Sequence, residues 1–271
     1  MRCLSARRVR GVTLIEMVIV ISITAIIAGA VAVFIARPVE GYADATRRAE
    51  LTDIADTALR RLTRDVRSAL PNSIRITPGA VVYLEFLQTS GGGRYRAQVD
   101  SGGGGDPLDF SAADGSFDVI GAMPPLAAGD SIVIYNLSSS GATANAYAGD
   151  NRRAYSSNAG ATINVTPTAT PFPFHSPGNR FQVVPHAVTY ACDTATGELR
   201  RYWSYGILAA QPTPPVTPNN ALLASEVLGC NFTYSSGGAS GRAGVVGVEL
   251  QVARAGETIR LFQQVHVSNA P

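Results

Sequence analysis

Charge is scarce in this sequence, and lysine is absent. Only 15% of the 271 residues are charged, and all 22 basic residues are arginine. Four of these arginines lie within the first ten positions, so the rest of the chain carries slightly more Asp and Glu than Arg. Because nucleic-acid-binding faces concentrate positive charge, this balance argues against a nucleic-acid partner. The 27 glycines and 16 prolines favour a loop-rich β domain over a helical bundle.

Recognisable catalytic motifs are also absent. The chain has no Gly-x-Ser-x-Gly, His-Glu-x-x-His or Cys-x-x-Cys string. Its three histidines (His175, His186 and His266) are scattered and show no zinc-ligand spacing with the cysteines. We therefore expect a protein that is not an enzyme and that holds no metal or other cofactor.

A loose acidic string in a Gly/Ser-rich region leaves one alternative open. It consists of Asp106, Asp109, Asp114 and Asp118. Such a loop could hold Ca²⁺, but the spacing matches no EF-hand. A solvated loop is the simpler expectation.

The one long apolar run lies near the N-terminus. Residues 17–36 are 20 consecutive uncharged, mostly apolar residues. At ~1.5 Å per residue, such a helix is about 30 Å long, enough to cross a hydrocarbon core. The arginines before it are expected to stay in the cytoplasm, which places everything after Arg37 on the other side of the membrane.

Glu16 lies at the head of this run, where an ionised carboxylate is costly unless it is neutralised or hydrated at the interface. A secretory signal peptide is an alternative reading of the segment, with Ala28-Gly29-Ala30 as its cleavage site. The apolar run is longer than usual for that class, and a charge within it would be unusual.

The string from Arg10 to Glu16 resembles the cleavage motif of type IV prepilins. A basic leader ends in Gly11, Val12 opens the mature chain, and Thr-Leu-Ile-Glu leads into the apolar helix. The resemblance implies cleavage between Gly11 and Val12 by a membrane-embedded prepilin peptidase and N-methylation of Val12. It also implies that Glu16 recruits the subunit by pairing with the N-terminus of a neighbour. Val12 departs from the Phe that most members carry.

Four segments are expected. They are a leader (1–11), a transmembrane or filament-core helix (12–36), an amphipathic helix (37–71) and a periplasmic β-rich head (72–271). Apolar residues recur at three- and four-residue steps from Leu51 to Ala69, and the helix is predicted to stop at Leu70, before Pro71. Pro38 and Gly41 predict a kink or a short break between the two helical halves.

The head is expected to be an antiparallel sheet with the helix laid across it, which makes the fold class α+β and pilin-like. Residues 91–105 contain two Gly clusters and are predicted to be flexible surface. The predicted strands are 80–87, 131–136, 162–166, 181–184, 187–192, 199–205, 230–234, 245–253 and 258–267.

Cys3 lies in the leader, which leaves Cys192 and Cys230 as a possible pair. If the head faces the oxidising periplasm, a disulfide between them is expected. The alternative is two separately buried thiols. A bridge closing these 39 residues would stabilise the head by about 3–4 kcal/mol.

Motifs at both ends of the chain resemble the MshO family of MSHA pilus biogenesis proteins. This resemblance implies a minor pilin that primes assembly or lies near the filament tip, with other major and minor pilins, the prepilin peptidase, the inner-membrane assembly platform and inner-membrane lipid as partners. The alternatives are a J-type pseudopilin of type II secretion and a membrane-anchored adhesin or carbohydrate-binding domain. The motifs are Val39-Glu40-Gly41-Tyr42, Arg47-Arg48-Ala49-Glu50-Leu51, Ala58-Leu59-Arg60-Arg61, Leu70-Pro71-Asn72-Ser73, Val188-Thr189-Tyr190, Arg201-Tyr202-Trp203 and the final eight residues, Gln264 to Pro271.

Overall fold

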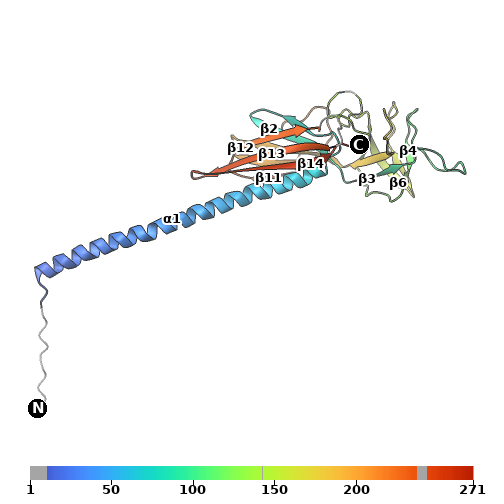
Figure 1. Cartoon of the computed structure of the whole chain (residues 1–271). Coiled ribbons are helices and arrows are strands. Elements are labelled where there is room, and N and C mark those ends of the chain that lie inside the picture. Colours follow the sequence, from blue (N-terminus) through green and yellow to red (C-terminus); the bar gives the residue numbers. More distant parts are fainter. Residues whose placement is uncertain (1–10, 142, 237–242, 271) are drawn as a thin grey trace, which may run out of the picture. The chain divides into compact units, whose positions relative to one another are not determined.

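The fold is α+β and pilin-like, as predicted: one long N-terminal helix is followed by antiparallel β-sheets (Figure 1). The computed structural model describes residues 11–141, 143–236 and 243–270. The predicted leader, apart from Gly11, lies outside the described residues. The chain divides into two compact units, Met1–Ala49 and Glu50–Pro271.

Helix α1 runs from Leu14 to Arg67 and has 54 residues. It stays helical through Pro38 and Gly41, so the break considered there does not occur. It ends three residues before the predicted stop because the chain joins the sheet first. Ala69 bridges to Gln88, and the N–H of Leu70 donates to the Leu87 carbonyl at 2.7 Å.

Two antiparallel sheets share one hydrophobic core with the second part of α1. The core includes the helix residues Leu51, Ala55, Leu62 and Val66, spaced at three to four residues and their multiples. The first sheet has the order β1-β2-β9-β10-β11, and the second has the order β12-β13-β14. Their strands are β1 (Arg75–Thr77), β2 (Val81–Gln88), β9 (His186–Asp193), β10 (Glu198–Tyr205), β11 (Asn220–Ala224), β12 (Val227–Ser235), β13 (Ala243–Arg254) and β14 (Glu257–Ser268).

A closed six-stranded barrel is inserted between β2 and β9, in the order β3-β4-β7-β6-β5-β8. It has its own core, in which Phe117, Phe181 and Ile132 are buried. The sequence did not predict this barrel. Its strands are β3 (Gly91–Tyr95), β4 (Ser116–Ile120), β5 (Ser131–Ile134), β6 (Arg152–Ala159), β7 (Thr162–Val165) and β8 (Arg180–Val184).

The prediction that residues 91–105 are flexible surface is wrong for the first Gly cluster, which forms β3. The reason is close backbone approach. A Cβ on Gly92 would lie 2.7 Å from the Phe181 carbonyl oxygen, and a Cβ on Gly93 would lie 2.9 Å from the Phe181 ring. The glycines therefore let β3 pass close to β8.

Candidate functional site

The segment predicted to be cleaved leads directly into the helix. Gly11, Val12 and Thr13 precede α1, which begins at Leu14. Gly11 and Val12 are exposed, and no atom lies within 4 Å of the position that a Cβ on Gly11 would take. The backbone on both sides of the predicted scissile bond is therefore open to a peptidase.

Thr13 caps the helix. Its Oγ1 accepts the N–H of Glu16 at 3.3 Å, and its carbonyl accepts the N–H of Met17 at 3.2 Å. Thr-Leu-Ile-Glu is thus also a Thr-x-x-Glu capping sequence. This local signal for a helix start was not used in the sequence analysis. Glu16 is exposed in the first turn, where the helix dipole favours a negative charge.

The apolar stretch that follows has no protein partner within the described part of the chain. Leu14–Ile35 is long and apolar enough to span a membrane, and every residue in it is exposed. Such a surface is unfavourable in water, so the segment needs lipid or other helices around it.

The comparisons with known proteins bear on this end of the chain. Residues 6–32 match the family model of the prokaryotic N-terminal methylation motif. The match supports a type IV pilin-like protein. Searches of curated proteins and of solved structures found no significant match.

A buried ion-pair cluster joins the second part of α1 to the first sheet. The Oδ2 of Asp65 accepts bonds from Arg201 Nε at 2.6 Å and from the Tyr190 hydroxyl at 2.9 Å. Arg61 Nε lies 3.3 Å from the other carboxylate oxygen. Burial, followed by the nearby Asp65 charge, raises the pKa of Tyr190, so its hydroxyl stays protonated as a donor. The cluster therefore fixes how the helix sits on β9 and β10.

A second buried cluster surrounds Glu85, whose side chain is fully buried. It pairs with Arg75 Nε at 2.5 Å and accepts the Tyr205 hydroxyl at 2.8 Å. Burial raises the pKa of the Glu85 carboxyl, while the bonds from Arg75 and Tyr205 act in the opposite direction. The Arg75 guanidinium also lies 3.7 Å from the ring centroid of Tyr147, so this cluster ties the first sheet to the loop between β5 and β6.

Two of the motifs quoted from opposite ends of the chain meet in space. The Asn72 N–H donates to Asn269 Oδ1 at 3.3 Å, and Asn72 Nδ2 donates to the Asn136 carbonyl at 3.0 Å. Asn136 Nδ2 in turn donates to the Pro71 carbonyl at 2.7 Å. This asparagine junction connects the end of the helix, the barrel and the end of β14. Sequence reasoning missed it, although an Asn directly after a Pro was a turn signal.

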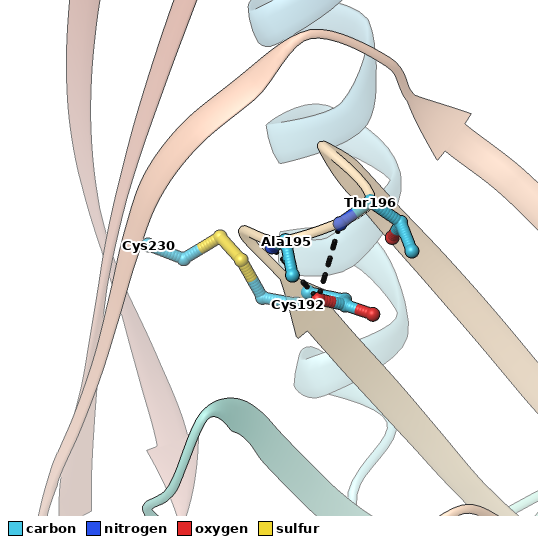
Figure 2. Close-up of a disulfide and its surroundings, with 5 residues drawn as sticks. Cys192, Ala195, Thr196 and Cys230 are labelled. Carbon is cyan, nitrogen blue, oxygen red and sulfur yellow. Dashed lines mark hydrogen bonds between the residues drawn. A yellow bond between two sulfur atoms is a disulfide. The ribbon is translucent and has the colours of Figure 1, made fainter.

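Cys192 and Cys230 form a disulfide with a Cα–Cα distance of 6.4 Å. Figure 2 shows it linking β9 to the strand that carries Cys230, β12, so it joins the two sheets. The adjoining turn is held by Asp193 Oδ1, which accepts the N–H groups of Ala195 and Thr196 at 2.9 and 3.3 Å. The predicted pair is therefore confirmed.

The carboxylates of the acidic string accept hydrogen bonds from nearby residues between β2 and β9. Asp118 accepts the Thr162 hydroxyl at 2.7 Å and the Asp106 N–H at 3.0 Å and pairs with Arg96 at 3.1 Å, and these bonds lower the pKa of its carboxyl. Asp106 accepts the Ser116 hydroxyl at 2.6 Å. Among the described residues, no three His, Cys, Asp or Glu side chains gather closely enough to hold a metal ion.

Proposed function

We propose that the chain is a minor pilin-like subunit that takes part in assembling a type IV pilus of the MSHA type, either by priming the filament or at its tip. The observation that carries this proposal is the methylation motif at residues 6–32, which overlaps the capped start of α1. Between Val12 and Ala36 the sequence bears a single charged side chain, Glu16. A purely hydrophobic anchor would not need that charge.

The chemistry follows from this arrangement. Prepilin peptidase cuts the open backbone between Gly11 and Val12 and methylates the new amino group of Val12. The exposed Glu16 carboxylate then pairs with the positively charged N-terminus of a neighbouring pilin as the subunit leaves the lipid. In an apolar environment, such a pair is strongly favoured over two isolated charges. The partners are other pilins, the peptidase and the inner-membrane assembly platform, and no enzymatic activity is assigned to the head.

We further propose that the protein lies in the inner membrane as a single-pass subunit with its head in the periplasm. Two observations support this orientation. The segment before the apolar run is rich in arginine, which the positive-inside rule keeps in the cytoplasm. The disulfide in the head suits an oxidising compartment.

The deciding experiment compares the membrane-extracted protein from cells with and without the prepilin peptidase, by intact mass and N-terminal sequencing. We expect a chain that starts at N-methylated Val12 only when the peptidase is present. A start near Val31, or an uncut Met1 in both strains, would refute the proposal.

A J-type pseudopilin shares the helix and the antiparallel head, so the branch needs its own test. Cross-linking in cells that carry both systems is expected to recover MSHA pilins with this chain. Recovery of type II secretion pseudopilins in their place would assign it to the secretion system.

A further inference from the structure

A groove of about 690 Å³ lies beside α1 on the head and is lined by residues of α1, β2, β9, β10 and β11. Arg61 lines it from the helix, Arg201 and Trp203 line it from β10, and residues 221–223 of β11 form its outer rim. All of these residues belong to the second unit, Glu50–Pro271. The groove has the volume of a ligand site.

The rim is an unpaired strand edge. β11 lies at the end of its sheet and, among the described strands, pairs only with β10. Leu222 is 46% exposed on this edge. A free edge of this kind presents backbone N–H and C=O groups to an incoming extended chain.

The two faces of an added strand would meet different surroundings. Residues directly opposite on neighbouring antiparallel strands share a face, so Leu222, which pairs with Arg200, lies on the face away from Arg201. A strand added beside β11 would therefore place alternate side chains toward the groove and next to Leu222.

The groove face is basic. Arg61 and Arg201 line it, and no carboxylate is among its lining residues. The carboxylate that both arginines contact, Asp65, is buried and also accepts the Tyr190 hydroxyl. Arg64, one turn further along the same side of the helix as Arg61, is exposed and adds to the positive charge.

We propose that this groove binds an extended acidic segment of a partner protein, which adds to the edge of β11. Its carboxylates face the exposed Arg61, since Arg201 is buried against Asp65. Its alternate apolar side chains cover Leu222, and its backbone pairs with residues 220–224. In a filament, the partner would be a neighbouring subunit, but the inference rests on the head alone and does not depend on cleavage at Gly11.

Trp203 provides a direct readout because it is the only tryptophan in the chain. The full chain in detergent is titrated with a short synthetic peptide of alternating Asp and Val. We expect a saturable change in Trp203 emission. Lys in place of Asp, or N-methylation of alternate peptide bonds, is expected to abolish that change.

Two variants locate the contact. Arg61→Gln removes a charge on the groove face, and Leu222→Asp replaces an exposed leucine on the opposite face by a carboxylate. Each is expected to weaken binding about tenfold. Leu228→Asp is the matched control because Leu228 is an exposed leucine (56%) of β12 outside the groove, and its affinity should equal that of the wild type.

Several outcomes would overturn the proposal. These are no response to the Asp/Val peptide, an equal response to the Lys or N-methylated peptide, or equal weakening of binding by Leu228→Asp. Tighter binding of a single-stranded oligonucleotide than of the Asp/Val peptide would also overturn it, because the groove would then be a general anion site. Should Leu222→Asp lower the unfolding temperature, Arg61→Gln and the N-methylated peptide still decide the question.

Discussion

At the scale of single residues, the charge of Glu16 has two expected effects: it stabilises the start of α1, and it pairs with a neighbouring subunit. Glu16 lies in the first turn of α1, where a carboxylate interacts favourably with the helix dipole, and its own N–H is capped by Thr13. A loss of function after Glu16→Ala would therefore mix a weakened helix start with a lost subunit contact.

Two substitutions separate these effects. Thr13→Ala removes the cap, is expected to cost about 1 kcal/mol of local helix stability, and should leave filament incorporation nearly unchanged. Glu16→Gln keeps the shape but removes the charge, and incorporation should fall sharply while cleavage after Gly11 persists. The measurement is the amount of mature protein in sheared filaments relative to the membrane. Equal loss in both variants would assign the defect to the helix start instead of the charge.

Asn72 is a second residue with a checkable role, because its backbone is left-handed (φ 56°) and its side chain donates across the asparagine junction. Asn72→Ala removes the side-chain hydrogen bond and puts a residue that disfavours positive φ at this position, so it is expected to lower head stability by about 2–3 kcal/mol. Asn72→Gly also removes the hydrogen bond but adopts a positive φ without strain, so it should lose less stability than Asn72→Ala. Urea unfolding followed by Trp203 emission measures both variants, and an alanine variant as stable as the glycine variant would contradict this reading.

At the scale of elements, the disulfide between β9 and β12 is a covalent cross-link between the two sheets. Replacing both Cys192 and Cys230 by Ser is expected to reduce the unfolding free energy by about 3–4 kcal/mol, the value for a closed loop of this length. The control is Cys3→Ser, which changes only the leader and should leave stability unaltered. Urea unfolding with and without reductant checks this, and reductant should destabilise the wild type but not the double variant.

The elements that the sequence predicted best are those with a strong local pattern. All nine predicted strand ranges overlap strands of the structure, including the hairpin of β13 and β14, whose alternation is regular. Two of the five described strands that were missed lack such a pattern. β3 opens with three glycines, and the five residues of β11 lie among Pro/Asn-rich loops.

The site was predictable only in part, for a similar reason. The cleavage motif and the cysteine pair are short strings or rare residues, which can be recognised without coordinates. The asparagine junction and the groove at β11 join residues far apart in the chain. Asn72 and Asn269 are 197 positions apart, so their contact depends on the packing of the whole head.

At the scale of the whole molecule, the helix contributes to the core of the head from Leu51 onward. A fragment of residues 50–271 is therefore expected to fold as a soluble protein with its disulfide formed. A fragment of residues 72–271, the head as bounded from the sequence, would lack six buried apolar residues of the helix and expose the core. These six are Leu51, Ala55, Ala58, Leu59, Leu62 and Val66.

The comparison needs periplasmic expression of both fragments, with solubility and thermal unfolding as readouts. We expect cooperative unfolding from the longer fragment and aggregation of the shorter one. A shorter fragment with the same unfolding temperature would show that the helix is dispensable for the head.

The insertion point of the barrel has a consequence for how such proteins diversify. The chain leaves the first sheet after Gln88 and returns at His186, and these two residues are directly paired across β2 and β9. A segment whose two ends are neighbours can be lengthened, shortened or exchanged during evolution without altering the register of the strands that carry it. Sequence change in the barrel is therefore decoupled from the N-terminal segment, so the barrel can diverge while that segment stays constant.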